Sequence, residues 1–130
     1  MMLEHLKALC QLNGISGRED AVQQYIIKQL ETWKLSYQVD PLGNILVKKD
    51  GQKPAKTKLM ISAHMDEVGG IVTYVHEDGT LQFEPVGGIQ PSVVIGRQVV
   101  VGENPGLPAV VGTTPIHLLS AKRRTTPVTF

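Results

Sequence analysis

His64 and Asp66 are the residues of this 130-residue chain whose types and spacing best suit a metal site. They lie two positions apart at the end of an apolar stretch, residues 58–64, which does not alternate and so predicts a strand covered on both faces. Side chains two positions apart on a strand share a face, and open α/β sheets bind ligands at the carboxyl ends of strands. A metal-bound imidazole donates its other N–H to a carboxylate or a carbonyl. The spacing therefore predicts His64 as a metal ligand, with Asp66 behind it or nearby.

A His-x-Asp triplet is common in sequences, so a structural histidine is the alternative interpretation of His64. The abrupt change from an apolar strand to polar residues and then to Gly69 and Gly70 favours a site. Glu67 could act as an acid, a base or a ligand, but on an ideal strand it faces away from His64. Its alternative role is a hydrogen bond at a domain junction. His117 could contact a partner or lie on the surface.

Other kinds of active site lack their motifs in this sequence. No glycine-rich loop lies between a strand and a helix, as a dinucleotide site requires, and no Gly-x-Ser-x-Gly elbow is present. Cys10 is the only cysteine, so an internal disulfide is excluded and a reducing cytoplasm is the expected compartment. Its place on an apolar helix face predicts a small buried side chain and not a nucleophile.

Two helices are expected near the start of the chain. Residues 2–12 have helical periodicity, and a second periodic segment ends near Trp33. Ser16 with Glu19 three positions later predicts a capping box at the start of the second helix.

Strands follow these helices. Period-two patterns predict a hairpin of residues 35–40 and 45–47, and the buried strand 58–64 completes an order that suits the start of an α/β sandwich. After a boundary near Gly69 and Gly70 the helical signal vanishes, and short strands at this spacing predict a small β-barrel. The expected strands of this second part are residues 71–75, 80–86, 98–101 and 108–113.

Charge and hydropathy exclude two kinds of partner. Lys and Arg number 13 and Asp and Glu number 12, and the net charge of +1 does not provide the basic surface that nucleic acid requires. The apolar stretches are far shorter than the ~20 residues of a membrane span, and no secretory signal is visible at the N-terminus. We therefore expect no nucleic-acid partner and no membrane partner.

Five segments together resemble one known family. They are NGISGRE (13–19), DPLGN (40–44), ISAHMDEVG (61–69), FEPVGG (83–88) and VGTTPIHLL (111–119). The resemblance is to the cytosolic dinuclear metallo-aminopeptidases that assemble as hollow tetrahedral dodecamers. These are the glutamyl, leucyl and deblocking aminopeptidases, some of which were once labelled endoglucanases or cellulases.

The resemblance implies a fold, a chemistry and an assembly. The fold would be α/β: the start of a phosphorylase/hydrolase-like α/β/α aminopeptidase domain at residues 1–69, then part of an inserted small β-barrel dimerisation domain at residues 70–130. His64 matches the histidine that binds one of two divalent metal ions, zinc or cobalt, and Asp66 matches the aspartate that orients that imidazole. In the family a metal-bridging water attacks the carbonyl beside a free N-terminus. Peptides are then the expected substrates, and a homo-oligomer built of dimers is the expected assembly.

The enzymes of this family are more than twice as long as this chain. Their remaining metal ligands and general base match no residue here, so the chain resembles an N-terminal piece. Because a catalytic zinc normally has three protein ligands, we expect the chain alone to bind catalytic metal weakly through His64 and to lack peptidase activity. An incomplete sheet leaves an unpaired edge, which predicts self-association or dependence on the missing portion.

Two other function classes stay open. A non-catalytic assembly module that keeps the dimerisation surface and has lost the active site fits the missing ligands equally well. A glycoside hydrolase, suggested only by the old family labels, would need two facing carboxyl groups. Asp66 and Glu67 would point to opposite faces of a strand, which argues against that chemistry.

Overall fold

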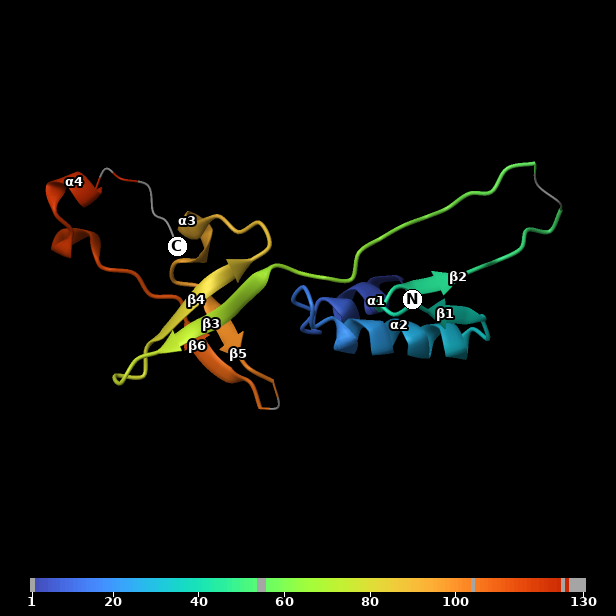
Figure 1. Ribbon diagram of the computed structural model, residues 1–130, viewed down its shortest axis with the longest axis horizontal. Coiled ribbons are helices and arrows are strands. Elements are labelled where there is room, and N and C mark those ends of the chain that lie inside the picture. The colour runs from blue at the N-terminus through green and yellow to red at the C-terminus, as the bar shows by residue number, and fades with distance from the viewer. Residues whose placement is uncertain (1, 54–55, 104, 125, 127–130) are drawn as a thin grey trace. The chain divides into compact units, whose positions relative to one another are not determined.

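The computed structural model describes residues 2–53, 56–103, 105–124 and 126 of the chain. The chain forms two compact units, Met1–Glu67 and Val68–Phe130, whose elements are labelled in Figure 1. In the part of the chain that is described, none of the helices is both long enough and apolar enough to cross a membrane.

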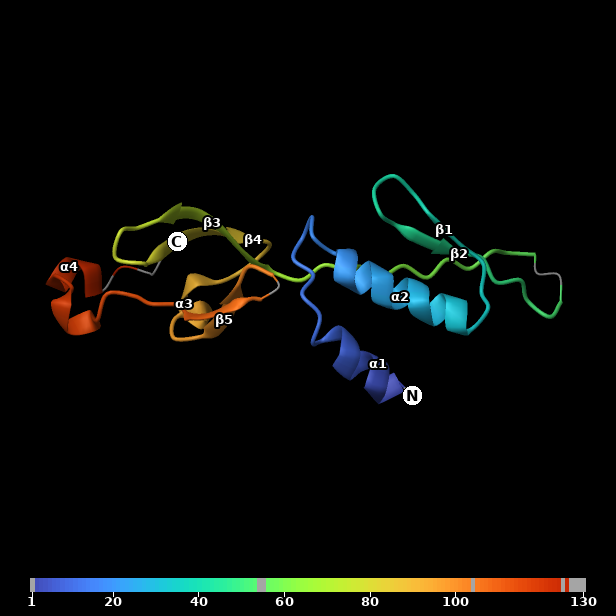
Figure 2. The same ribbon diagram turned by 90° about the horizontal axis from the view of Figure 1, so that it is seen from below.

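The first unit contains two helices and one hairpin. Its elements are α1 (Met2–Leu9), α2 (Asp20–Thr32), β1 (Tyr37–Val39) and β2 (Ile45–Val47). The strands pair antiparallel, with Tyr37 opposite Val47, so the predicted hairpin is confirmed. Figure 2 shows α2 between α1 and the hairpin. Val22 and Leu30 of α2 are buried, each 7% exposed, and they form the core of this unit.

The hairpin turn is held by the side chain of Asp40. Its Oδ1 accepts the backbone N–H groups of Leu42 and Asn44, and its Oδ2 accepts the side-chain amide of Asn44 at 2.8 Å. These hydrogen bonds hold the pKa of Asp40 below its ordinary value, and the bond from the Asn44 side chain has the largest effect. Gly43 has a φ of +87°, which glycine adopts without the strain of a side chain. The bonds that the Asp40 side chain makes to this turn are therefore all local.

The predicted capping box between α1 and α2 is wrong. Helix α2 begins at Asp20, and its N-cap residue Glu19 makes no side-chain capping bond. The Glu19 carboxylate accepts the N–H of Gly17, at 2.8 Å, while the hydroxyl of Ser16 donates to Asp66. The prediction that Cys10 is buried is also wrong: its side chain is exposed, and α1, which ends at Leu9, has no buried residue among those described.

The apolar segment at residues 58–64 does not form the predicted strand. Its residues Leu59, Met60 and Ile61 are 87–88% exposed. A strand buried on both faces needs strands beside it and helices across it, and the described residues supply neither to this segment. The nearest ladder contact is an isolated parallel bridge between Ile15 and Glu67.

The second unit contains two hairpins. Strands β3 (Gly69–Val75) and β4 (Leu81–Val86) pair antiparallel, and so do β5 (Gln98–Val101) and β6 (Leu107–Val110). The turn between β3 and β4 is held by Asp78, whose carboxylate accepts both the backbone N–H and the hydroxyl of Thr80. The strands of the predicted barrel thus form two-stranded sheets among the described residues, and no ladder between the hairpins is found there.

Short helices also occur in the second unit, where the sequence predicted none. They are α3 (Pro91–Val94), η1 (Ile116–Leu118) and α4 (Ala121–Arg124). Each has three or four residues, which is too few for a 3.6-residue period to be visible in the sequence.

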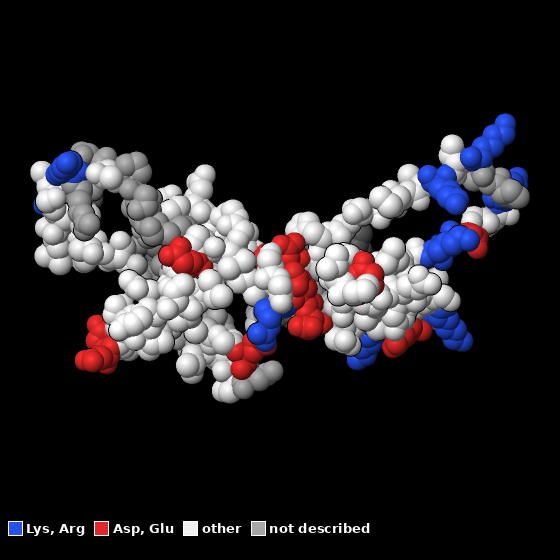
Figure 3. All heavy atoms as spheres, in the orientation of Figure 1, with Lys and Arg blue, Asp and Glu red and all other residues white. Residues whose placement is uncertain are grey.

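On the face shown in Figure 3, the charged side chains of the described residues lie in small separate groups.

Candidate metal-binding site

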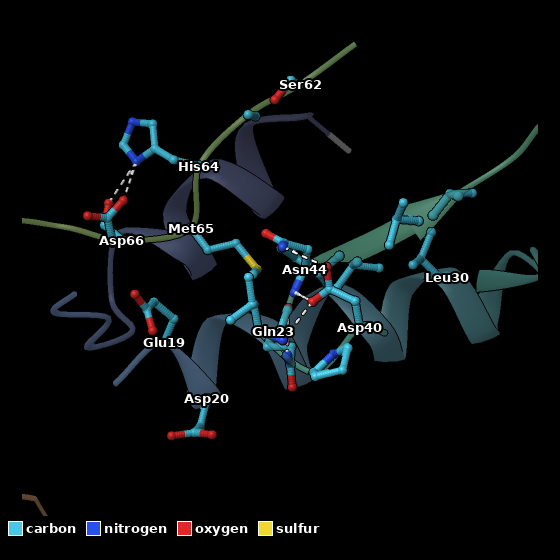
Figure 4. Close-up of a pocket in the computed structure, with 18 of the residues that line it drawn as sticks. Glu19, Asp20, Gln23, Leu30, Asp40, Asn44, Ser62, His64, Met65 and Asp66 are labelled. Atoms are coloured by element: carbon cyan, nitrogen blue, oxygen red, sulfur yellow. Dashed lines mark hydrogen bonds and ion pairs between the residues drawn. The ribbon is translucent and has the colours of Figure 1, made fainter. Parts of the chain in front are cut away.

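The imidazole of His64 is held by Asp66 (Figure 4). Its Nδ1 lies 2.9 Å from Oδ1 of Asp66 and 3.0 Å from the backbone carbonyl oxygen of the same residue. Both partners accept hydrogen bonds, so Nδ1 carries the proton and donates it. The other ring nitrogen, Nε2, is left as a lone-pair donor on a side chain that is 84% exposed. This is the tautomer that a metal-binding histidine needs.

The second carboxylate oxygen of Asp66 has its own partner. The hydroxyl of Ser16 donates to Oδ2 at 2.5 Å. This bond holds the pKa of Asp66 below its ordinary value; partial desolvation opposes the effect, and the hydrogen bond from His64 adds to it. Asp66 is therefore ionised at neutral pH and accepts hydrogen bonds at both oxygens.

Glu67 points to a different partner. Its Oε1 accepts the backbone N–H of Gly14 at 3.0 Å, and its own N–H donates to the carbonyl of Gly14 at 2.7 Å. Gly14 is buried, and a Cβ there would lie 2.8 Å from Cγ2 of Val22 and 3.3 Å from the carbonyl oxygen of Met65. The Gly14 segment is thus fastened to the segment that carries Asp66, and the Glu67 carboxylate serves this attachment.

A groove of about 990 Å³ lies beside these residues, lined by α2, the hairpin turn and residues 60–66. In Figure 4 the side chain of Met65 points toward Gln23, while the His64 ring turns toward Asp66. Gln23 in turn donates from its side chain to the carbonyl of Gly43, at 2.8 Å. The groove wall is therefore braced by a bond between α2 and the turn.

The described residues contain no group of three or more His, Cys, Asp or Glu side chains placed to hold a metal ion. One oriented imidazole fits a single ligand position, whereas a catalytic zinc takes three protein ligands. The site as described can present a ligand but cannot complete a metal centre.

The remaining histidines have other surroundings. His5 is half-buried: its Nδ1 is 2.8 Å from the Tyr25 hydroxyl, and its ring packs edge-on against Trp33. His117 is exposed in η1, where its backbone carbonyl accepts a hydrogen bond from Arg124, and its contact with a partner stays a prediction. The residue that sequence reasoning missed is Ser16, since its contact with Asp66 spans 50 positions and leaves no local signal.

Comparison with known sequences finds a matching family and similar proteins. Residues 43–130 match the family model described as M42 glutamyl aminopeptidase. The glutamyl aminopeptidase of Lactococcus lactis subsp. cremoris is 34% identical to this chain over 120 residues, which cover 91% of the chain and 34% of that protein.

Solved structures of similar proteins also superpose on this chain. The TET1 peptidase of Pyrococcus horikoshii, which can assemble into a tetrahedron or a large octahedral shell, superposes with a TM-score of 0.78 at 37% identity, covering 99% of this chain and 38% of that chain. An endoglucanase of Thermotoga maritima superposes with a TM-score of 0.70 at 37% identity, covering 85% and 34%. This chain thus spans about a third of the length of these relatives, and the predicted α/β fold of their N-terminal part is confirmed.

Proposed function

The chain belongs to the M42 glutamyl aminopeptidase family, and from this membership we propose that it forms part of a metal-dependent aminopeptidase that removes N-terminal residues from peptides. The observation that carries this proposal is the His64 imidazole, whose Nδ1–H is held by Asp66 so that Nε2 is free for a metal ion. A glutamyl aminopeptidase and a lysyl aminopeptidase, which match 91% and 88% of this chain, support the same reaction class.

We assign each residue one task. His64 supplies a ligand nitrogen, and Asp66 holds the ring in the tautomer and orientation that expose it. Two divalent ions, zinc or cobalt, suit imidazole and carboxylate ligands, and when bound they would polarise the peptide carbonyl and activate water. His64 fits one ligand position of such a centre, and the described residues bring together no group of three candidate ligands.

This proposal is tested by replacing His64 and Asp66 in the protein as its host produces it. We expect His64→Ala to abolish hydrolysis of an aminoacyl-nitroanilide. Asp66→Asn should lower this activity by about 10- to 100-fold, the usual effect of removing a residue that hydrogen-bonds a metal ligand. The matched control is Asp50→Asn, an exposed aspartate that pairs with Lys48 on the loop after β2. Unchanged activity of His64→Ala would refute the assignment.

We further propose that the 130 residues by themselves bind catalytic metal weakly and have no peptidase activity, since one imidazole is a single ligand. The same nitroanilide assay applies, with added zinc or cobalt. Measurable hydrolysis by the pure 130-residue chain that disappears in His64→Ala would overturn this part of the proposal.

The domain assignment and the assembly are also proposals. We assign residues 1–69 to the catalytic domain and residues 70–130 to part of an inserted β-barrel domain that mediates dimerisation. The TET1 peptidase of Pyrococcus horikoshii assembles into closed shells, which supports a homo-oligomer built of dimers for this protein too. A cytoplasmic location suits the exposed thiol of Cys10, which stays reduced there.

An assembly module without catalytic function is the second candidate. It is favoured by one observation, that the described residues contain no metal-binding group of three side chains. The intact mass of the host's own product separates the two candidates: a mass near 14.2 kDa favours the module, and one more than twice as large favours the enzyme. A glycoside hydrolase finds no support in the contacts, because Asp66 and Glu67 bind different partners and do not face each other.

A further inference from the structure

We propose that Ser16 is a positioning residue for the metal ligand: its hydroxyl fixes the carboxylate plane of Asp66 and, through it, the ring of His64. The inference rests on the proposed function, because it takes His64 as the ligand. Its basis is a chain of two hydrogen bonds, from the Ser16 hydroxyl to Oδ2 of Asp66 and from Nδ1 of His64 to Oδ1 of Asp66.

Asp66 needs a second partner to hold its carboxylate still. Rotation about the Cβ–Cγ bond is broad for aspartate, and a single bond to His64 leaves it free. The side chain of Asp66 is 41% exposed, so water would compete for the second oxygen. A hydroxyl fixed on the other side removes that freedom and thereby orients the imidazole.

Ser16 is itself held in place by the backbone around it. The N–H of Arg18 donates to the carbonyl of Ile15 at 2.8 Å, and Gly17 takes a φ of +86°, so the chain turns sharply just after Ser16. The N–H of Gly17 is bonded to the Glu19 carboxylate. Because Ile15 also bridges to Glu67, this turn is fastened to the residue next to Asp66.

The hydroxyl of Ser16 has no competing role in the helix that follows. Helix α2 begins at Asp20, its N-cap residue is Glu19, and no side chain caps it. The bond to Asp66 is therefore the one that the hydroxyl makes among the described residues.

The test measures the His64 ring and metal affinity in the protein as its host produces it. Ring ¹⁵N shifts of His64 in the metal-free protein report the tautomer, and titration with Co²⁺ alone reports affinity. We expect Ser16→Ala to reduce the share of the Nδ1–H tautomer and to weaken Co²⁺ binding by about tenfold. This is the lower end of the affinity losses seen when residues that support a metal ligand are replaced. Ser16→Thr, which keeps the hydroxyl, should restore both. Ser92→Ala is the matched control, since it removes an exposed hydroxyl in α3.

The outcomes separate the two proposals. An unchanged tautomer and unchanged Co²⁺ affinity in Ser16→Ala would overturn the role of Ser16. Equal losses in Ser16→Ala and Ser16→Thr would also overturn it, because a structural role would then explain both. If Ser16→Ala does not fold, Ser16→Cys, which keeps the size but donates poorly, takes its place. If His64→Ala leaves Co²⁺ affinity unchanged, the proposed function fails at His64, while the tautomer measurement still decides the role of Ser16.

Discussion

Gly14→Ala tests whether the Gly14 segment is packed as tightly as the contacts indicate. The new Cβ would lie 2.8 Å from Cγ2 of Val22, about 0.7 Å inside the ~3.5 Å at which carbon atoms meet comfortably. Val22 is buried and stiff at χ1, and the other neighbour at 3.3 Å is the backbone oxygen of Met65, so neither yields easily.

The expected cost follows from two opposing terms. Overpacking a buried site costs about 1–3 kcal/mol. Replacing glycine by alanine restricts the unfolded chain, which returns about 0.4–1 kcal/mol. We therefore expect Gly14→Ala to lower the free energy of unfolding by about 1–2 kcal/mol.

Urea unfolding followed by the fluorescence of Trp33 measures this change. Trp33 is the only tryptophan and lies in the same unit as Gly14. Hydrogen exchange at the Glu67 amide, which donates to the Gly14 carbonyl, should accelerate in parallel. Gly51→Ala is the matched control, because a Cβ there would meet only a carbonyl oxygen at 3.5 Å, an ordinary contact, and it should cost nothing.

A double mutant checks the physical cause. Val22→Ala removes the methyl group that the new Cβ would strike, so the two changes together should cost about 1 kcal/mol less than the sum of their separate effects. Strict additivity, or a Gly14→Ala variant as stable as the unmodified chain, would refute the reasoning.

The hairpin turn, the core and the apolar segment each allow a further test. The folded-state pKa of Asp40 is lowered, so its carboxylate stabilises the turn at pH values above the ordinary aspartate range. That contribution is lost as the pH falls through the lowered pKa; protection of the Asn44 amide should fall with it, and an unchanged profile in Asp40→Asn would contradict this account. Leu30→Ala should cost about 2–4 kcal/mol in urea unfolding, whereas Leu42→Ala, at a side chain 88% exposed, should cost almost nothing. The 130-residue chain should self-associate through the apolar segment at residues 59–61, and Ile61→Lys should lower its mass in light scattering; a monodisperse unmodified monomer would contradict this.

Local patterns were sufficient for the parts of the fold whose partners are close in sequence. The hairpin follows from period-two strands around a turn, and its Asp40 contacts reach no further than Asn44. The bond between His64 and Asp66 belongs to the same class, because two positions of spacing bring the side chains together with little help from the rest of the chain. The five segments that resemble the aminopeptidases also placed the chain in its family, as the family match confirms.

Strand formation at residues 58–64 illustrates the opposite case. An apolar run predicts burial, but a strand exists only when a neighbouring backbone accepts and donates its hydrogen bonds. The described residues do not provide that neighbour, so Leu59, Met60 and Ile61 remain exposed. The short helices of the second unit were missed for a different reason, since three or four residues are too few to show a helical period.

The sequence by itself determined the family, the order of helices α1 and α2 and strands β1 to β6, and the pairing of His64 with Asp66, because each of these depends on residues that are near neighbours or on whole motifs. Only the tertiary structure decided where the Ser16 hydroxyl goes. Its sequence neighbour Glu19 offers a capping box, yet the bridge between Ile15 and Glu67 brings Asp66 within reach across 50 positions, and the charged acceptor there receives the bond. The Ser16 hydroxyl donates to an ionised carboxylate, a strong acceptor, and no spacing rule in the sequence records such a contact.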